Sequence, residues 1–179
     1  MKSALLVIDV QRALCKGEYG AVDADRVIER INTVAAKARA AAVPVVFIQH
    51  ETEDGVLRHG TDGWKLAEGL EALATDIRLR KKATDSFHQT ELHALLQDLR
   101  VTRLVICGLQ SEFCVDTTTR RALALGYPVV LVADGHSTMD SPVLTADQIS
   151  RHHNHTLANI SSFGPRVRAI DASEVTFEA

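Results

Sequence analysis

The sequence lacks several features that would assign it to well-known classes of protein. Only three of its 179 residues are cysteine, Cys15, Cys107 and Cys114, and under any pairing one thiol is left over. No CxxC pair occurs, so we expect a reducing, cytoplasmic setting. Apolar runs stay far shorter than a bilayer requires. Asp9 follows the first apolar run too early for a signal peptide.

An excess of positive charge is also missing. The net charge is −3, which gives no electrostatic reason to expect binding to nucleic acid or to an anionic membrane. No GxGxxG or P-loop pattern occurs, so Gly108 indicates turn geometry rather than a phosphate site. Repeats, linkers and low-complexity segments are absent. With 46% apolar and 24% charged residues the chain is globular, and its length fits one domain over residues 1–179.

What the sequence does contain is a regular alternation of short apolar runs with segments of helical periodicity. The expected strands are 4–10, 43–48, 77–82, 104–107, 128–134 and 167–170. The expected helices are 23–42, 64–74, 90–100, 114–125 and 145–160. Strands that alternate with helices of this length form right-handed crossover units. The sequence therefore predicts an α/β fold with three layers, α/β/α, around a six-stranded, mostly parallel sheet.

The segment 103–126 joins a buried strand, a tight turn and a helix, and it carries Cys114 at the start of the helix. The positive end of the helix dipole favours the thiolate, which is the reactive form of cysteine. Cys114 is therefore a candidate nucleophile. The alternative is a buried structural cysteine, which is how we interpret Cys15 and Cys107.

Other ionisable residues fall where the predicted strands end, and in open α/β sheets ligands bind beyond those ends. These residues are Asp9, His50, and Lys81 or Lys82. An ammonium group near a thiol stabilises the thiolate, and a carboxylate can take the thiol proton and later give it to a leaving amine. Asp9 could instead form an ion pair or cap a helix, and Lys81 could be a solvated surface charge.

Three sequence blocks in this order resemble the isochorismatase-like cysteine hydrolases. The blocks are ALLVIDVQ at 4–11, LRKKATDSFHQTELHALL at 79–96, and VICGLQSEFCVDTTTRRALALGYPVVLVADGHST at 105–138. The family includes nicotinamidases, N-carbamoylsarcosine amidases, and ureidoacrylate and maleamate amidohydrolases. The resemblance extends from about residue 4 to residue 160, and it implies the family's Rossmann-like α/β/α fold.

The resemblance also implies roles for individual residues. Asp9, Lys81 and Cys114 occupy the positions of the family's catalytic residues. The family's lysine lies six residues before a phenylalanine, which selects Lys81, and a strand lets only one of Lys81 and Lys82 face the site. A non-proline cis peptide is expected at Leu109–Gln110, with the backbone N–H groups of Gln110 and Cys114 forming an oxyanion hole.

The activity that this implies is hydrolysis of a carboxamide or ureido C–N bond of a small molecule through a thioester, by a homodimer or homotetramer without a cofactor. One alternative is a metal-assisted nicotinamidase-type or isochorismatase-type hydrolase. The Asp-x-His of metal-using nicotinamidases is not present, because Ile48 and Gln49 precede His50, so no metal is expected. Isochorismatases do not use a cysteine nucleophile. The other alternative is a non-catalytic or redox-sensing protein that uses the Cys114 thiol.

Five further residues are candidates for substrate contacts: Gln11, His50, Trp64, Phe87 and Phe113. Gln11 lies two residues beyond Asp9, on the same side of a continued strand. His50 could line the pocket or form hydrogen bonds to other site residues. Trp64 could face the substrate or anchor the core, since aromatic residues make up only 4% of the chain. The two phenylalanines flank the expected catalytic residues in sequence.

Overall fold

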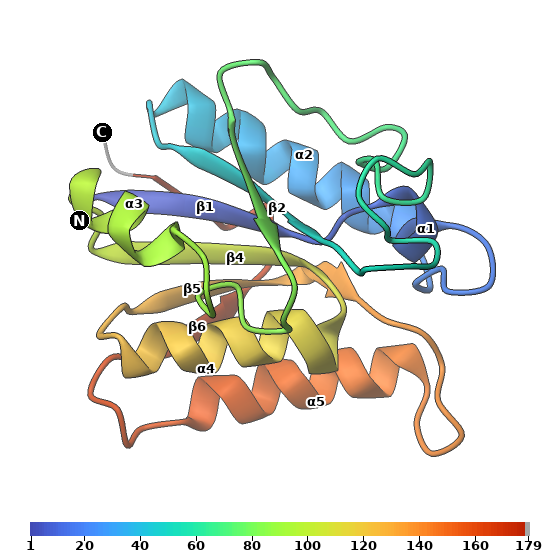
Figure 1. Cartoon of the computed structure of the whole chain (residues 1–179). Coiled ribbons are helices and arrows are strands. Elements are labelled where there is room, and N and C mark those ends of the chain that lie inside the picture. Colours follow the sequence, from blue (N-terminus) through green and yellow to red (C-terminus); the bar gives the residue numbers. More distant parts are fainter. Residues whose placement is uncertain (178–179) are drawn as a thin grey trace.

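Six parallel strands form the central sheet of the molecule in the computed structural model, which describes residues 1–177 (Figure 1). Their order across the sheet is β3-β2-β1-β4-β5-β6, and each neighbouring pair is parallel. The strands are β1 (Ser3–Ile8), β2 (Val45–His50), β3 (Ile77–Lys81), β4 (Arg103–Leu109), β5 (Val129–Ser137) and β6 (Val167–Ile170). The predicted α/β class and the six strands are confirmed.

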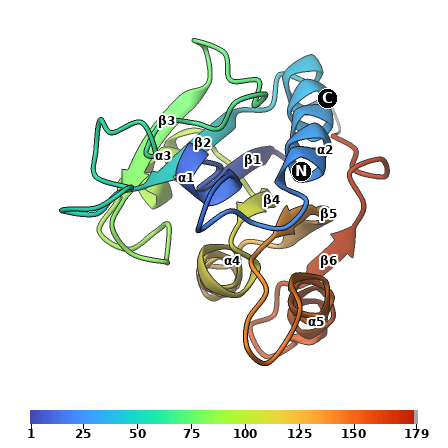
Figure 2. The same cartoon turned by 90° about the vertical axis from the view of Figure 1, so that its right-hand side faces the viewer.

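Helices cover both faces of this sheet, which gives the three predicted layers (Figure 2). The helices are α1 (Arg12–Cys15), α2 (Ala24–Ala40), α3 (Leu92–Asp98), α4 (Asp116–Ala124) and α5 (Ala146–Asn159), with a π-helical turn over Ser111–Val115. Helix α2 packs on one face, and α3, α4 and α5 pack on the other. None of the helices among residues 1–177 combines the length and apolar character needed to cross a membrane.

Strand β1 lies in the middle of the sheet, and all six of its residues are buried. Its side chains alternate between the two cores: Leu5 and Val7 pack with α2, whereas Leu6 and Ile8 pack with the helices of the opposite face. A central parallel strand is covered on both faces, which explains its continuous apolar run. Because β1 is buried on both faces, the ionisable Asp9 directly after it is conspicuous.

The two longest helices follow the sequence pattern closely. The buried face of α2 contains the predicted Val27, Ile31 and Val34. Helix α5 begins after Thr145, whose side chain accepts a hydrogen bond from the backbone N–H of Gln148 in a capping box. Amphipathic periodicity and a capping residue were sufficient to predict both elements.

The helix predicted over 64–74 is wrong, because this segment is an irregular loop. Two of its backbone groups bond to the chain that follows β1: Lys65 O accepts from Arg12 N–H, and Ala67 N–H donates to Val10 O. Gly69 adopts a positive φ of 80°, which also interrupts a helix. Tertiary hydrogen bonds therefore take up backbone groups that a helix would have paired locally.

Strand β5 is longer than predicted and contains an irregularity near its end. Ile106 of β4 pairs with Leu131 of β5. Gly108, two positions further along β4, pairs with His136, which is five positions further along β5. The extra residues of β5 interrupt the pairing and bring His136 beside Gly108, close to the turn that follows β4.

Gly108 lets β1 and β4 approach each other closely at the carboxyl edge of the sheet. Its φ is +121°, and a Cβ on this residue would overlap the carbonyl oxygen of Ile8. Both the backbone conformation and the space therefore require glycine at this position.

We expect Gly108→Ala to lower the free energy of unfolding by more than about 3 kcal/mol, because the methyl group forces β1 and β4 apart. Chemical denaturation followed by circular dichroism measures this loss. The matched control is Gly126→Ala, since Gly126 has a φ of +92° and open space around its Cβ position; we expect a loss of about 1–2 kcal/mol there. Equal losses in the two variants would contradict the steric explanation.

Candidate active site

Three of the predicted residues, Asp9, Lys81 and Cys114, meet in a buried cluster at the carboxyl edge of the sheet. The Lys81 Nζ lies 2.6 Å from Asp9 Oδ2 and 3.2 Å from Cys114 Sγ. Asp9 follows β1, Lys81 is the last residue of β3, and Cys114 lies in the π-helical turn after β4. The cluster sits beside the switch in strand order between β1 and β4, where ligand sites of such sheets occur.

Asp9 is held in an unusual backbone conformation directly after β1. Its φ is +53°, a left-handed conformation that costs a residue with a side chain about 1 kcal/mol or more. Its N–H donates to Ile48 O at 2.8 Å, and its C=O accepts from Gln11 N–H at 2.8 Å. The Oδ1 atom is buried and has no hydrogen-bond partner among residues 1–177. One carboxylate oxygen is thus bound to Lys81, and the other is free to accept a proton.

Lys81 is buried, whereas the neighbouring Lys82 is exposed, as strand alternation requires. Its ammonium group has three N–H donors but four acceptors within reach. Besides Asp9 and Cys114, these acceptors are the Ala83 carbonyl and His50 Nδ1, each at 3.1 Å. The ammonium can therefore exchange the thiol of Cys114 for another partner without leaving its position.

Burial and, after it, the nearby Asp9 carboxylate raise the pKa of the Cys114 thiol to about 12, against the lowering effect of Lys81. The resting form of Cys114 is thus a neutral thiol. Burial and the Asp9 carboxylate thus oppose the thiolate that a position at a helix start favours. The physical reason is that desolvation and a negative neighbour outweigh the single positive charge.

His50 and Gln11 support the cluster rather than line an open pocket. Burial lowers the pKa of His50, and the Lys81 charge lowers it further, so the imidazole is neutral at pH 7 and can accept through Nδ1. The Gln11 amide nitrogen donates to His50 O and Trp64 O, and its oxygen accepts from His50 N–H. The side-chain oxygen and nitrogen of Gln11 are thus both hydrogen-bonded. Gln11 thereby connects the chain after β1 with the end of β2 and with the loop that contains Trp64.

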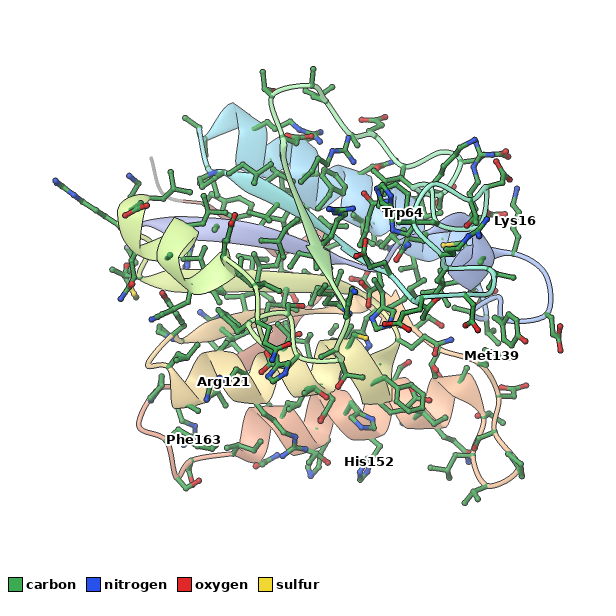
Figure 3. The ribbon with its side chains drawn as sticks, in the orientation of Figure 1. Lys16, Trp64, Arg121, Met139, His152 and Phe163 are labelled. Atoms are coloured by element: carbon green, nitrogen blue, oxygen red, sulfur yellow. The ribbon has the colours of Figure 1, made fainter. Side chains whose placement is uncertain are left out.

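The three predicted aromatic contacts lie in different environments. Trp64 lines a pocket of about 780 Å³ that is also bordered by Lys81 and Lys82, and it lies near the carboxyl edge (Figure 3). Phe87 is buried in the core, where its ring contacts His93 and Tyr127. Phe113 points outward with 51% of its surface exposed. Of the three, only Trp64 borders this pocket.

The turn that carries Cys114 begins with the peptide bond Leu109–Gln110, which is cis, and this confirms the expected cis peptide. Two side-chain contacts that were not predicted also hold the turn. The hydroxyl of Thr138 donates to Glu112 Oε1 at 2.9 Å, and Ser111 Oγ lies 2.7 Å from His136 Nδ1. His136 and Thr138 lie at the end of β5. The sequence signal that could have pointed to them is that they are polar residues just after the predicted apolar strand 128–134.

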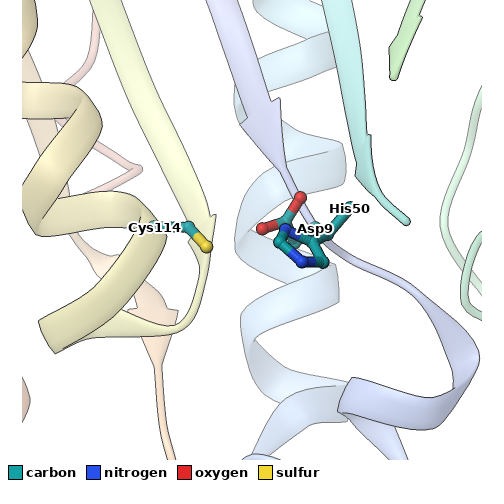
Figure 4. A group of neighbouring side chains, drawn as sticks. All are labelled: Asp9, His50 and Cys114. Atoms are coloured by element: carbon teal, nitrogen blue, oxygen red, sulfur yellow. The ribbon is translucent and has the colours of Figure 1, made fainter. Parts of the chain in front are cut away.

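Asp9, His50 and Cys114 also form the group of side chains with metal-ligand geometry within residues 1–177 (Figure 4). Their candidate ligand atoms lie within 4.8 Å of one another. However, the ammonium of Lys81 contacts all three side chains. A divalent cation would have to displace this charge or bind against it, so the donor set suits an ammonium better than a metal.

Comparison with known proteins agrees with the geometry. Residues 3–169 match the model of the isochorismatase domain. Two proteins of Streptomyces noursei named streptothricin hydrolase are 42% and 41% identical over 140 residues, which is 78% of this chain. The chain covers 56% and 51% of their lengths, so it spans about half of these relatives.

Solved structures show the same fold. A crystal structure of an isochorismatase family protein has a TM-score of 0.86 and 36% identity, with 95% of this chain and 98% of that chain covered. N-carbamoylsarcosine amidase from Thermoplasma acidophilum has a TM-score of 0.80 at 22% identity, with 98% and 99% covered. At that identity the second comparison concerns the fold alone. With the domain match extending over nearly the whole sequence, the chain belongs to the isochorismatase family.

Proposed function

We propose that the protein is a cysteine hydrolase that cleaves a carboxamide or ureido C–N bond of a small molecule through a thioester intermediate. One observation carries this proposal: the buried Lys81 ammonium contacts both the Asp9 carboxylate and the Cys114 thiol. A nucleophile, a base and a fixed positive charge are thereby within one cluster.

In the first half of the reaction, the neutral thiol of Cys114 loses its proton to Asp9 Oδ1 as sulfur attacks the substrate carbonyl carbon. Lys81 stabilises the sulfur as negative charge develops on it. The C=O π electrons move to oxygen and form a tetrahedral oxyanion. When this intermediate collapses, the C–N bond breaks, and the protonated Asp9 gives its proton to the departing nitrogen. The products are a thioester and ammonia or an amine.

In the second half, Asp9 removes a proton from a water molecule, whose oxygen attacks the thioester carbon. The second tetrahedral intermediate expels the Cys114 sulfur, and the proton held by Asp9 returns to this sulfur. The acid product leaves, a carboxylic acid from a carboxamide or a carbamic acid from a ureido compound, and the resting thiol is restored. The backbone N–H groups of Gln110 and Cys114 are the proposed donors to both oxyanions.

The substrate class follows from the same chemistry, and the relatives suggest where to begin the search. Two of them carry the name streptothricin hydrolase, so streptothricin belongs in the first panel beside primary amides and ureido compounds. Trp64 is the proposed substrate contact, because it borders a pocket that reaches Lys81, although the lining of this pocket includes neither Asp9 nor Cys114. A cytoplasmic location, supported by three free cysteines, and a homodimer or homotetramer complete the proposal.

We expect Cys114→Ala to lower ammonia or amine release by about a thousandfold or more, because the variant has no nucleophile. Lys81→Met should lose at least about a hundredfold, since the positive charge beside the sulfur is gone. Release from the panel compounds, measured enzymatically with and without EDTA, tests both variants.

Two matched controls accompany these variants. Cys15→Ala removes a buried cysteine outside the cluster, and Lys82→Met removes the adjacent exposed charge; each should stay within about twofold of wild type. Wild-type turnover by Cys114→Ala would sink the proposal. Loss of activity in EDTA would favour metal-assisted hydrolysis, and reversible oxidation of Cys114 without any turnover would favour redox sensing.

The raised pKa of Cys114 predicts how the free thiol reacts with pH. Because the thiolate is the reactive form and the pKa is about 12, alkylation of Cys114 by iodoacetamide should rise about tenfold per pH unit from pH 6 to pH 9. Peptide mapping by mass spectrometry measures this rate. A plateau at or below pH 8 would instead indicate a resting thiolate paired with Lys81.

Asp9→Asn provides a test with opposite signs for the two readouts. Removing the carboxylate lowers the pKa of Cys114, because a negative neighbour is lost, so alkylation at pH 8 should become about tenfold faster or more. Hydrolysis should nevertheless be lost, because no base remains to move the proton. Slower alkylation in this variant would contradict the assigned electrostatics.

A further inference from the structure

A second polar cluster lies behind the nucleophile turn and does not take part in the proposed chemistry. It connects His136 at the end of β5, Ser111 at the start of the π-helical turn, and Ser150 and Asn154 on α5. Ser111 and His136 are both buried, at 0% and 4% exposure. Buried polar groups of this kind are retained only when each has a partner.

The hydrogen bonds of this cluster have a defined direction. Asn154 Nδ2 donates to the carbonyl of Ala133 at 3.0 Å, so its Oδ1 must face His136. His136 Nε2 lies 2.9 Å from that oxygen and therefore carries the proton. Nδ1 of the neutral ring is then an acceptor, and the Ser111 hydroxyl donates to it at 2.7 Å. Ser150 Oγ, at 2.9 Å, donates in turn to Ser111.

The neutral ring is the form that the surroundings favour. Burial lowers the pKa of His136, and His153 acts in the same direction, against the weaker influence of the Asn154 hydrogen bond and of Asp134. The direct hydrogen-bond partners of the ring are an amide and a hydroxyl, and no carboxylate bonds to it within residues 1–177. The bond to Ser111 is thus maintained through the neutral pH range.

A serine, a histidine and an asparagine in a row resemble a hydrolytic triad, but access excludes this function. Ser111 has no exposed surface. The hollow of about 290 Å³ between α2 and α5 reaches His136, Ser150 and Asn154 but does not include Ser111 among its lining residues. A substrate carbonyl could not approach the Ser111 hydroxyl, so the cluster has a supporting function.

We propose that His136 is a positioning residue: its ring, oriented by Asn154, fixes Ser111 and thereby the turn that presents Gln110 and Cys114 to Asp9 and Lys81. The inference rests on the proposed role of Cys114. The backbone supports it, because Ser111 lies next to Gln110 and its carbonyl accepts from the N–H of Asp116, the residue that begins α4. Ser111 is therefore joined to both sides of Cys114.

The test uses alkylation of the three cysteines in the whole folded protein, with iodoacetamide at pH 7.5. His136→Phe keeps a ring without nitrogens, and Asn154→Ala removes the orienting amide from a half-buried helix position. Both should release Cys114 from the buried site that raises its pKa. Alkylation of Cys114 then accelerates about tenfold for each unit by which its pKa falls, and release of ammonia or amine declines.

Cys15 and Cys107 report on general loosening in the same sample. Both are buried and have raised pKa values, so they should alkylate as slowly as in wild type while Cys114 accelerates. Parallel acceleration of all three cysteines would mean that the variants unfold globally, and the proposal would be overturned. The matched control is Asn159→Ala on the same helix, because within residues 1–177 the Asn159 side chain bonds to His155 O alone.

A double variant tests whether Asn154 acts through His136. If it does, His136→Phe with Asn154→Ala should alkylate no faster than His136→Phe alone; multiplied effects would overturn the linear arrangement. Cys114 alkylation within twofold of the Asn159→Ala control would overturn the proposal itself. Since alkylation needs no turnover, such a failure is distinct from persistent hydrolysis by Cys114→Ala, which concerns the proposed function.

Discussion

The buried ion pair between Lys81 and Asp9 is the contact on which the rest of the site depends. Two charges placed out of water at a separation of 2.6 Å are tolerated only when they satisfy each other, and removing one leaves the other uncompensated at a cost of about 3–5 kcal/mol. The pair sets the electrostatic field at Cys114. Burial and the carboxylate favour the neutral thiol, and the ammonium is in position to stabilise the negative charge that forms on sulfur during attack.

This arrangement explains why so much of the surrounding structure serves to hold backbone in place. Asp9 adopts a left-handed conformation, and Gln11 joins the ends of β1 and β2. Gly108 lets the backbone of Ile8 come so close that no side chain would fit between them. The turn with Cys114 is fixed from the opposite side by His136 and Thr138. Proton transfer between groups only a few ångströms apart requires such fixed positions.

Most of the fold could be predicted from local patterns. The continuous apolar run before Asp9, the helical face of α2 and the Thr145 cap are properties of neighbouring residues, and the structure follows them. The helix prediction for 64–74 is wrong because the segment depends on distant partners: two of its hydrogen bonds are formed with Val10 and Arg12, more than fifty positions away. A pattern within eleven residues contains no information about those partners.

The sequence by itself determined the strands and the order of the three motif blocks, because periodicity and spacing are local quantities. The choice of Lys81 over Lys82 came from the family resemblance together with the alternation of a strand. Only the tertiary structure decided that Lys81 reaches Asp9 across 72 positions of sequence, that Gln11 is fully engaged in holding strand ends, and that His136 stands behind the nucleophile turn. It also decided the direction in which the pKa of Cys114 shifts. A pKa depends on burial and on charges that folding brings within a few ångströms, and neither can be counted along the chain.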